Sequence, residues 1–122
     1  MDEKIYDVNV NKTAKNDIRE IIKFISKNNP VNALNVLKRI QDRIDSLYKF
    51  PERGGYVQEL LKYNIKDYRQ LTESPWRIIY KIDGNIVNVI MVINSRRNTQ
   101  DILVEKLLGI NEINPANQFN GN

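Results

Sequence analysis

The chain has 122 residues, which is enough for one domain with a modest hydrophobic core. It contains no cysteine and no histidine, so it has neither disulfides nor zinc–cysteine sites nor a histidine general base, and we expect no metal site and no cofactor. Nineteen Lys and Arg against fifteen Asp and Glu give a net charge of +4, which favours an anionic partner, either nucleic acid or an acidic protein segment.

The N-terminal residues 1–8 carry acidic side chains and lack the hydrophobic stretch of a secretory signal. No apolar run approaches the ~18 residues that a membrane span requires. We therefore expect a cytoplasmic protein with no membrane partner.

The first two elements are predicted from their hydrophobic periods. Residues 4–10 alternate apolar and polar side chains, which predicts a short half-buried strand. From Ala14 to Ile25 the apolar residues recur every three or four positions, which predicts an amphipathic helix. Asn11 or Thr13 is the candidate N-cap of this helix.

A second long helix follows the break at residues 28–30, with Asn29 as N-cap and Pro30 as its first residue. Its predicted apolar stripe comprises Ala33, Leu34, Leu37, Ile40, Ile44, Leu47 and Tyr48. The short break predicts an antiparallel hairpin packed on one side of a sheet. The side chains that we expect to be buried there are Ile18, Ile22, Leu37, Ile40 and Ile44.

Residues 68–97 form the most informative stretch, because they read as three consecutive strands. Asp83-Gly84 is a strong signal for the turn of the last hairpin. Ile86 to Ile93 is apolar almost throughout and predicts an interior strand covered on both faces. Residues 56–67, before the meander, show no clear pattern.

The chain is predicted to end its folded part with a short helix. Asn98 or Thr99 is the candidate cap, and Gly109 follows the last apolar residues. Residues 110–122 are polar, contain Pro and Gly and have no period, so we expect a disordered tail after a single domain that spans residues 1–109.

Arginines accompany every strand of the predicted meander, although guanidinium is costly to bury in a sheet. Arg69 lies in the first strand, Arg77 in the second, and Arg96 and Arg97 follow the third. Together they predict a cationic face that binds phosphate or carboxylate groups through paired hydrogen bonds. The simpler alternative is that each arginine reaches solvent at a strand edge or end.

Strand alternation separates the side chains of the second strand into two sets. Trp76 and Tyr80 share one face, for which a core role is favoured over base stacking. Arg77 and Lys81 share the other face, about 7 Å apart, a spacing that would allow them to grip successive phosphates. Arg69 has an alternative structural role, in which it bonds backbone carbonyls of the preceding loop.

Motifs in a fixed order carry a resemblance that covers about residues 5–108. They are Thr13-Ala14 with Asp17-Ile18, the helix start from Pro30 to Ala33, Phe50-Pro51 with Gly54-Gly55, Val57-Gln58-Glu59-Leu60, Tyr68-Arg69-Gln70-Leu71, Arg77-Ile78-Ile79-Tyr80 and Val92-Ile93-Asn94-Ser95-Arg96-Arg97. In this order the chain resembles the RelE/ParE superfamily of toxins from type II toxin–antitoxin systems, of the plasmid-stabilisation type. The resemblance implies an α+β fold with an N-terminal strand, a long antiparallel helical hairpin, a three-strand antiparallel meander and a short C-terminal helix. It also implies a growth-arresting toxin with a cognate antitoxin, in a homodimer or a toxin–antitoxin hetero-oligomer.

Two chemistries are known in this superfamily: RelE-like members cleave messenger RNA on the ribosome, and ParE-like members poison DNA gyrase. If the chain is a nuclease, the resemblance assigns catalytic roles to Arg77, Arg69, Glu59 and Arg96. The expected C-terminal acid is missing, however, because residues 94–107 contain neither tyrosine nor histidine, and Asn94 stands where many relatives have histidine. We therefore favour a ParE-like gyrase inhibitor.

The residues predicted to bind the target or the antitoxin are Arg69, Arg77, Lys81, Arg96 and Arg97. Glu59 is more simply read as an ion-pair partner of one arginine than as a base. Two other hypotheses remain open, a ribosome-dependent endoribonuclease and a non-toxic family member that binds only a partner. If the arginines act on the target, Arg77→Ala should reduce growth arrest and leave the fold unchanged. The double variant Arg96→Ala with Arg97→Ala should do the same.

Overall fold

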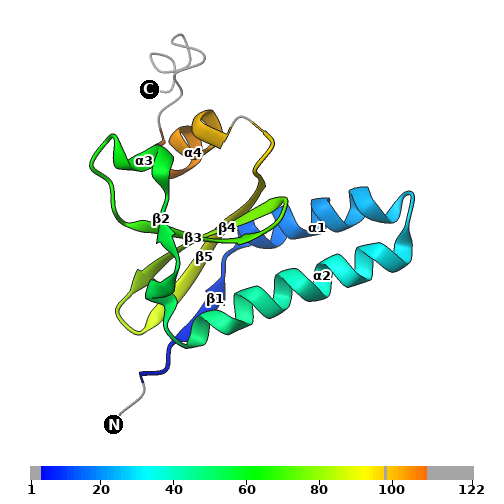
Figure 1. Ribbon diagram of the computed structural model, residues 1–122, viewed down its shortest axis with the longest axis horizontal. Coiled ribbons are helices and arrows are strands. Elements are labelled where there is room, and N and C mark those ends of the chain that lie inside the picture. The colour runs from blue at the N-terminus through cyan, green and yellow to red at the C-terminus, as the bar shows by residue number, and fades with distance from the viewer. Residues whose placement is uncertain (1–3, 98, 110–122) are drawn as a thin grey trace.

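The computed structural model describes residues 4–97 and 99–109, so the predicted tail, residues 110–122, lies outside the described residues. The elements in chain order are β1 (Asp7–Val10), α1 (Lys12–Ser26), α2 (Pro30–Asp45), the 3₁₀ turns η1 (Ser46–Tyr48) and η2 (Pro51–Arg53), β2 (Gly55–Tyr56), α3 (Gln58–Leu61), β3 (Tyr68–Glu73), β4 (Trp76–Asp83), β5 (Ile86–Asn94) and α4 (Thr99–Leu108). The strands form one sheet in the order β1-β5-β4-β3-β2, in which β1 runs parallel to β5 and the other pairs are antiparallel. The predicted α+β fold is confirmed (Figure 1).

The predicted helical hairpin is confirmed, including its caps. The Asn11 side chain accepts a hydrogen bond from the Ala14 N–H, and the Asn29 side chain accepts one from the Asn32 N–H. Pro30 is the first helical residue, where its missing N–H costs nothing. Figure 1 shows α1 and α2 running side by side and projecting beyond the sheet.

The hairpin packs on one face of the sheet and forms the larger core there. Ile40 and Ile44 are buried as predicted, whereas Ile18, Ile22 and Leu37 are only half-buried. The residues of α2 and η1 that are buried are Ala33, Val36, Ile40, Ile44 and Leu47.

The predicted apolar stripe of α2 is too wide. Leu34 is 67% exposed and Tyr48 is 44% exposed, while the buried Val36 was not predicted. Leu34 directly follows the buried Ala33 and so points about 100° away from it around the helix, and Tyr48 lies after the end of α2, in η1.

A second, smaller core covers the opposite face of the sheet. Its buried residues come from the loop after β2, from α3, from the middle strands and from α4, and are Val57, Leu60, Ile79, Met91, Ile93 and Leu103. The segment 56–67, which the sequence left undefined, therefore contains the second half of β2 and the single helical turn α3. Its function in the fold is to place Leu60 and Glu59 beside β4.

The predicted strand hairpin is confirmed. Gly84 turns between β4 and β5 with a φ of 58°, a left-handed conformation that glycine adopts without strain. β5 is an interior strand between β1 and β4, and its pairing with β4 shifts register between Ile79 and Tyr80. The final helix, α4, ends as predicted before Gly109, which also has a positive φ. Among the described helices, none is both long and apolar enough to cross a bilayer.

Candidate functional site

Arg77 lies on the face of the sheet that carries α3 and α4, and it is 8% exposed. Its Nη1 and Nη2 donate to the Glu59 carboxylate over 2.7 and 2.9 Å, and its Nε donates to Gln70 Oε1 over 2.9 Å, while Nη2 also contacts Gln70 Oε1. The guanidinium is therefore held as a bidentate pair in a nearly closed site. Glu59 is the ion-pair partner of Arg77, as the simpler interpretation predicted.

Arg69 lies on the opposite face of the sheet. It pairs in register with Tyr80, whose side chain is in the hairpin-side core, so its own side chain leaves the sheet on that side. Arg69 Nη1 donates to the backbone oxygens of Glu52 and Gly54 over 3.0 and 2.8 Å, and the guanidinium lies 4.4 Å from the Tyr56 ring centroid. Its predicted structural role, bonding the carbonyls of the preceding loop, is confirmed.

Tyr80 fixes the same loop from inside the core. It is fully buried and its hydroxyl donates to the Pro51 carbonyl, and burial raises the pKa of the Tyr80 phenol. Gly54 is required by this close approach, because a Cβ there would overlap the Tyr80 hydroxyl and the Gln70 carbonyl. Tyr80 is thus a core residue, as predicted.

The other predicted cations lie apart from Arg77. Lys81, on the same face, is 3.8 Å from Asp83 and 5.9 Å from the Tyr68 ring centroid. Arg96 and Arg97 are exposed in the turn after β5, where Asn94 accepts hydrogen bonds from both of their backbone N–H groups. Their guanidinium groups are the accessible ones of the predicted set.

The predicted single cationic face is therefore wrong. In the β3–β4 ladder Arg69 pairs with Tyr80, and Arg77 pairs with Thr72. Arg69 and Thr72 are three residues apart on β3, and an odd separation along a strand places Arg69 and Arg77 on opposite faces of the sheet. Arg77 and Lys81 share a face as predicted, but the Arg77 guanidinium is already bound to Glu59.

Two grooves flank the long hairpin. The first, which we call the hairpin groove, encloses about 800 Å³ and is lined by Val10, Lys15, Ile18, Arg19, Leu34, Leu37, Lys38, Gln41, Asp42, Ile44 and Asp45. Its lining combines five apolar side chains with three cationic ones, Lys15, Arg19 and Lys38, and two acidic ones, Asp42 and Asp45.

The second groove lies between α1, the end of β5 and α4, and encloses about 670 Å³. Asp17 lines it, and its Oδ2 accepts a hydrogen bond from the Val92 N–H beyond the end of β1. Burial raises the pKa of the Asp17 carboxyl, although that hydrogen bond opposes the rise. Asp17 thereby replaces the missing strand partner of β5, and Arg97 and Lys106 also line this groove.

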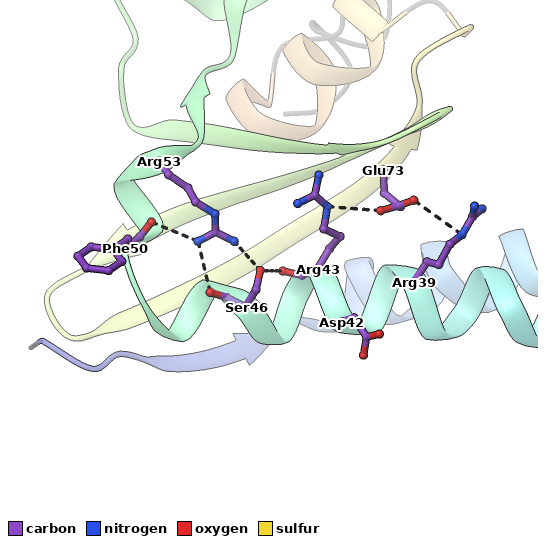
Figure 2. Close-up of a pocket in the computed structure, with 7 residues that line it drawn as sticks. All are labelled: Arg39, Asp42, Arg43, Ser46, Phe50, Arg53 and Glu73. Atoms are coloured by element: carbon purple, nitrogen blue, oxygen red, sulfur yellow. Dashed lines mark hydrogen bonds and ion pairs between the residues drawn. The ribbon is translucent and has the colours of Figure 1, made fainter.

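A further cationic site was not predicted, because its residues come from the polar side of α2 and from segments far away in sequence. We call it the α2 arginine pocket; it encloses about 520 Å³ and is lined by Arg39, Asp42, Arg43, Ser46, Phe50, Arg53 and Glu73 (Figure 2). The only feature of the sequence that indicates this pocket is the spacing of Arg39 and Arg43, which lie about one helical turn apart on α2. Among the described residues, no group of acidic side chains is arranged to hold a metal ion.

Comparison with known proteins shows the family. Residues 8–99 match the family model described as the ParE toxin of type II toxin–antitoxin system, parDE. The chain belongs to the ParE toxin family. No curated protein sequence matches it.

Solved structures support the ParE fold at low sequence identity. The chromosomal ParDE toxin–antitoxin system from P. aeruginosa has a chain that superposes with a TM-score of 0.62 at 16% identity, over 75% of this chain and 97% of that chain. The toxin–antitoxin complex RelBE2 from Mycobacterium tuberculosis gives 0.53 at 20% identity, over 74% and 98%. The E. coli toxin RelE in the free state, as a mutant with two arginines replaced by alanine, superposes with a TM-score of 0.57 at 15% identity, over 87% of this chain and 98% of that chain. The recognition of a RelE/ParE superfamily toxin is confirmed.

Proposed function

We propose that this ParE-family toxin arrests growth by binding DNA gyrase, without bond chemistry of its own, and that a cognate antitoxin neutralises it. The observation that supports gyrase binding without bond chemistry is that the residues which a nuclease would need are bound to other groups or buried. Glu59 and Arg77 are bound to each other through two short hydrogen bonds and are largely shielded from solvent.

RNA cleavage without a metal needs a base for the 2′-hydroxyl, a cation for the phosphate and an acid for the leaving oxygen. Arg69 leaves the opposite face of the sheet from Arg77, so the two cannot converge on one phosphate. Tyr80 is buried with its hydroxyl bonded to Pro51, which removes it as the acid. These placements favour the gyrase hypothesis over the nuclease hypothesis.

Of the predicted cations, Arg96 and Arg97 are the most exposed, whereas Lys81 is partly buried and close to Asp83. Replacing both arginines with Ala should relieve growth arrest and weaken inhibition of gyrase supercoiling by at least tenfold, because charged contacts at a protein interface typically contribute this much. Thermal unfolding should be unchanged, since both side chains are exposed. The measurement is a supercoiling assay with purified protein, run beside a ribosome toeprint on a short message.

Lys12→Ala with Lys23→Ala is the matched control, because it removes the same charge from exposed positions on α1. It should leave inhibition intact. Message cleavage by the wild-type protein in the toeprint would establish the nuclease instead, and the absence of growth arrest from the wild-type protein would identify a non-toxic family member.

The antitoxin partner is proposed because the neighbouring ParDE and RelBE2 structures are toxin–antitoxin systems. The hairpin groove offers the exposed Leu34 and the half-buried Leu37 to an amphipathic segment. Lys15, Arg19 and Lys38 would meet acidic residues beside its apolar face. An acidic, amphipathic segment of the antitoxin is thus the occupant that we propose.

Leu34→Ala should weaken antitoxin binding on the order of tenfold or more, because a leucine buried at an interface contributes about 1.5–3 kcal/mol. The association rate should fall as salt rises, since exposed charges steer the encounter. Binding kinetics with the product of the adjacent small gene test this, with the exposed Val31→Ala as control. Amide protection confined to residues after Gly109 on binding would contradict the proposed site.

A further inference from the structure

The α2 arginine pocket contains a guanidinium pair that is positioned but not closed off. Arg39 Nε lies 3.7 Å and Arg43 Nε 3.3 Å from the two oxygens of Glu73, which comes from the end of β3. Arg43 Nη2 also donates to the Thr72 carbonyl over 3.0 Å. Figure 2 shows Glu73 between the two arginines, which project from neighbouring turns of α2.

The contacts of Glu73 with these arginines involve their Nε atoms. The side chains of Arg39 and Arg43 are 53% and 46% exposed, and Glu73 is the one polar partner of Arg39 among residues 4–97 and 99–109. Both guanidinium groups are thus about half exposed and can bind a further anion, although Arg43 Nη2 is already bonded to the Thr72 carbonyl. The charges of the pocket favour an anion too, because three arginines face Glu73 and Asp42, and Asp42 also pairs with Lys38 at 3.4 Å.

Arg53 shapes the next part of the same surface. Its Nη1 donates to the carbonyls of Lys49, Phe50 and Ser46 over 2.9, 3.2 and 3.3 Å, which ties down the chain after α2. Ser46 Oγ, which accepts from Arg53 Nη2, donates in turn to the Arg43 carbonyl over 2.6 Å. The cation here is a structural one, and it holds Phe50 in place.

Phe50 is unusual in both its backbone and its exposure. Its φ of 51° lies in the left-handed region, which a bulky side chain adopts only at a cost of about 1–3 kcal/mol. Its ring is nevertheless 64% exposed, and Tyr48, two residues earlier, is 44% exposed. An aromatic ring displayed on a strained backbone beside arginines is not explained by core packing.

We propose that this surface binds single-stranded nucleic acid, with Arg39 and Arg43 on phosphates and Phe50 as a stacking platform for a base. Proteins that bind single-stranded nucleic acid combine cationic side chains, which contact the phosphates, with exposed aromatic rings, because every base has a face that can stack on a ring. From Arg39 to Tyr48 the helical rise spans roughly 14 Å, long enough for several nucleotides. The inference is independent of the gyrase proposal, since its test contains neither gyrase nor ribosomes.

The test measures fluorescence anisotropy of labelled oligo(dT) and oligo(U) dodecamers, which separate DNA from RNA, over a series of salt concentrations. Arg39→Gln with Arg43→Gln should reduce the slope of log affinity against log salt by about 1.4, since each phosphate contact to a single strand contributes about 0.7. Phe50→Leu should lower affinity by roughly fivefold to a hundredfold and leave the slope unchanged, because it removes stacking and no charge.

Glu73→Gln should raise the affinity, because it removes the anion that competes with phosphate. The control is Lys12→Gln with Lys23→Gln, which removes two charges elsewhere and should change affinity less than the Arg39/Arg43 pair does. The proposal would be overturned if the two charge variants lost the same affinity or if Phe50→Leu had no effect. It would also be overturned if duplex DNA bound equally tightly, or if a glutamate-rich peptide bound with higher affinity and displaced the oligonucleotide.

Discussion

Removing either side chain of the Arg77–Glu59 pair is expected to destabilise the protein by about 3–5 kcal/mol, the usual cost of leaving one charge of a buried pair without its partner. Arg77 is 8% exposed, and its bonds to Glu59 and Gln70 join β4 to α3 and β3. α3 is a single turn of four residues, too short to be stable alone, so this pair and Leu60 hold it on the sheet.

Urea unfolding of Arg77→Met, Glu59→Gln and the double variant measures the effect. The double variant should be less destabilised than the sum of the single variants, because neither charge remains unpaired in it. The control is the exposed pair Lys38–Asp42, 77% and 62% exposed, where Lys38→Met should cost less than about 0.5 kcal/mol. A loss below about 1 kcal/mol for Arg77→Met would show that solvent reaches the pair.

This expectation replaces the one drawn from the sequence, in which Arg77→Ala leaves the stability unchanged. The sequence places Arg77 on the polar face of a strand, but it does not show that α3 covers that face. Loss of growth arrest in an Arg77 variant would therefore report a damaged fold as readily as a lost contact. Arg96 and Arg97, which are exposed, are the better probes of target binding.

The parts of the fold that could be predicted from the sequence are those determined by neighbouring residues. Asn29 and Pro30 start α2, and Gly84 turns the last hairpin, because capping and turn geometry depend on side chains within a few positions. The apolar periods likewise place α1, α2 and β5. Each of these predictions depends only on residues close together in sequence, and the structure confirms the elements that they predict.

The parts that were missed depend on residues that are distant in sequence. β2 consists of two residues that pair with Arg69 and Gln70, a pattern too short to produce a period. Glu73 lies 34 and 30 positions from Arg39 and Arg43, so the α2 arginine pocket exists only after β3 packs against α2. From sequence the two arginines look like an ordinary solvated helix face.

Replacing Ile40 with Ala is expected to cost about 2–5 kcal/mol of unfolding free energy, the range for truncation of a buried isoleucine. Ile40 has no exposed surface and lies in the core between α2 and the sheet, together with Ile44, Ile78 and Tyr80. The cost includes the cavity that remains, because the sheet on one side and the hairpin on the other limit how far the site can collapse.

Leu34 on the same helix is the matched control, since it is 67% exposed and lines the hairpin groove. Leu34→Ala should change the unfolding free energy by less than about 0.5 kcal/mol, because its side chain is already in water. The two variants thus separate the two faces of α2: the Ile40 face is buried and stabilises the fold, whereas the Leu34 face is exposed. Chemical denaturation of both variants measures this, and an Ile40→Ala loss as small as that of Leu34→Ala would mean that α2 does not pack on the sheet through this face.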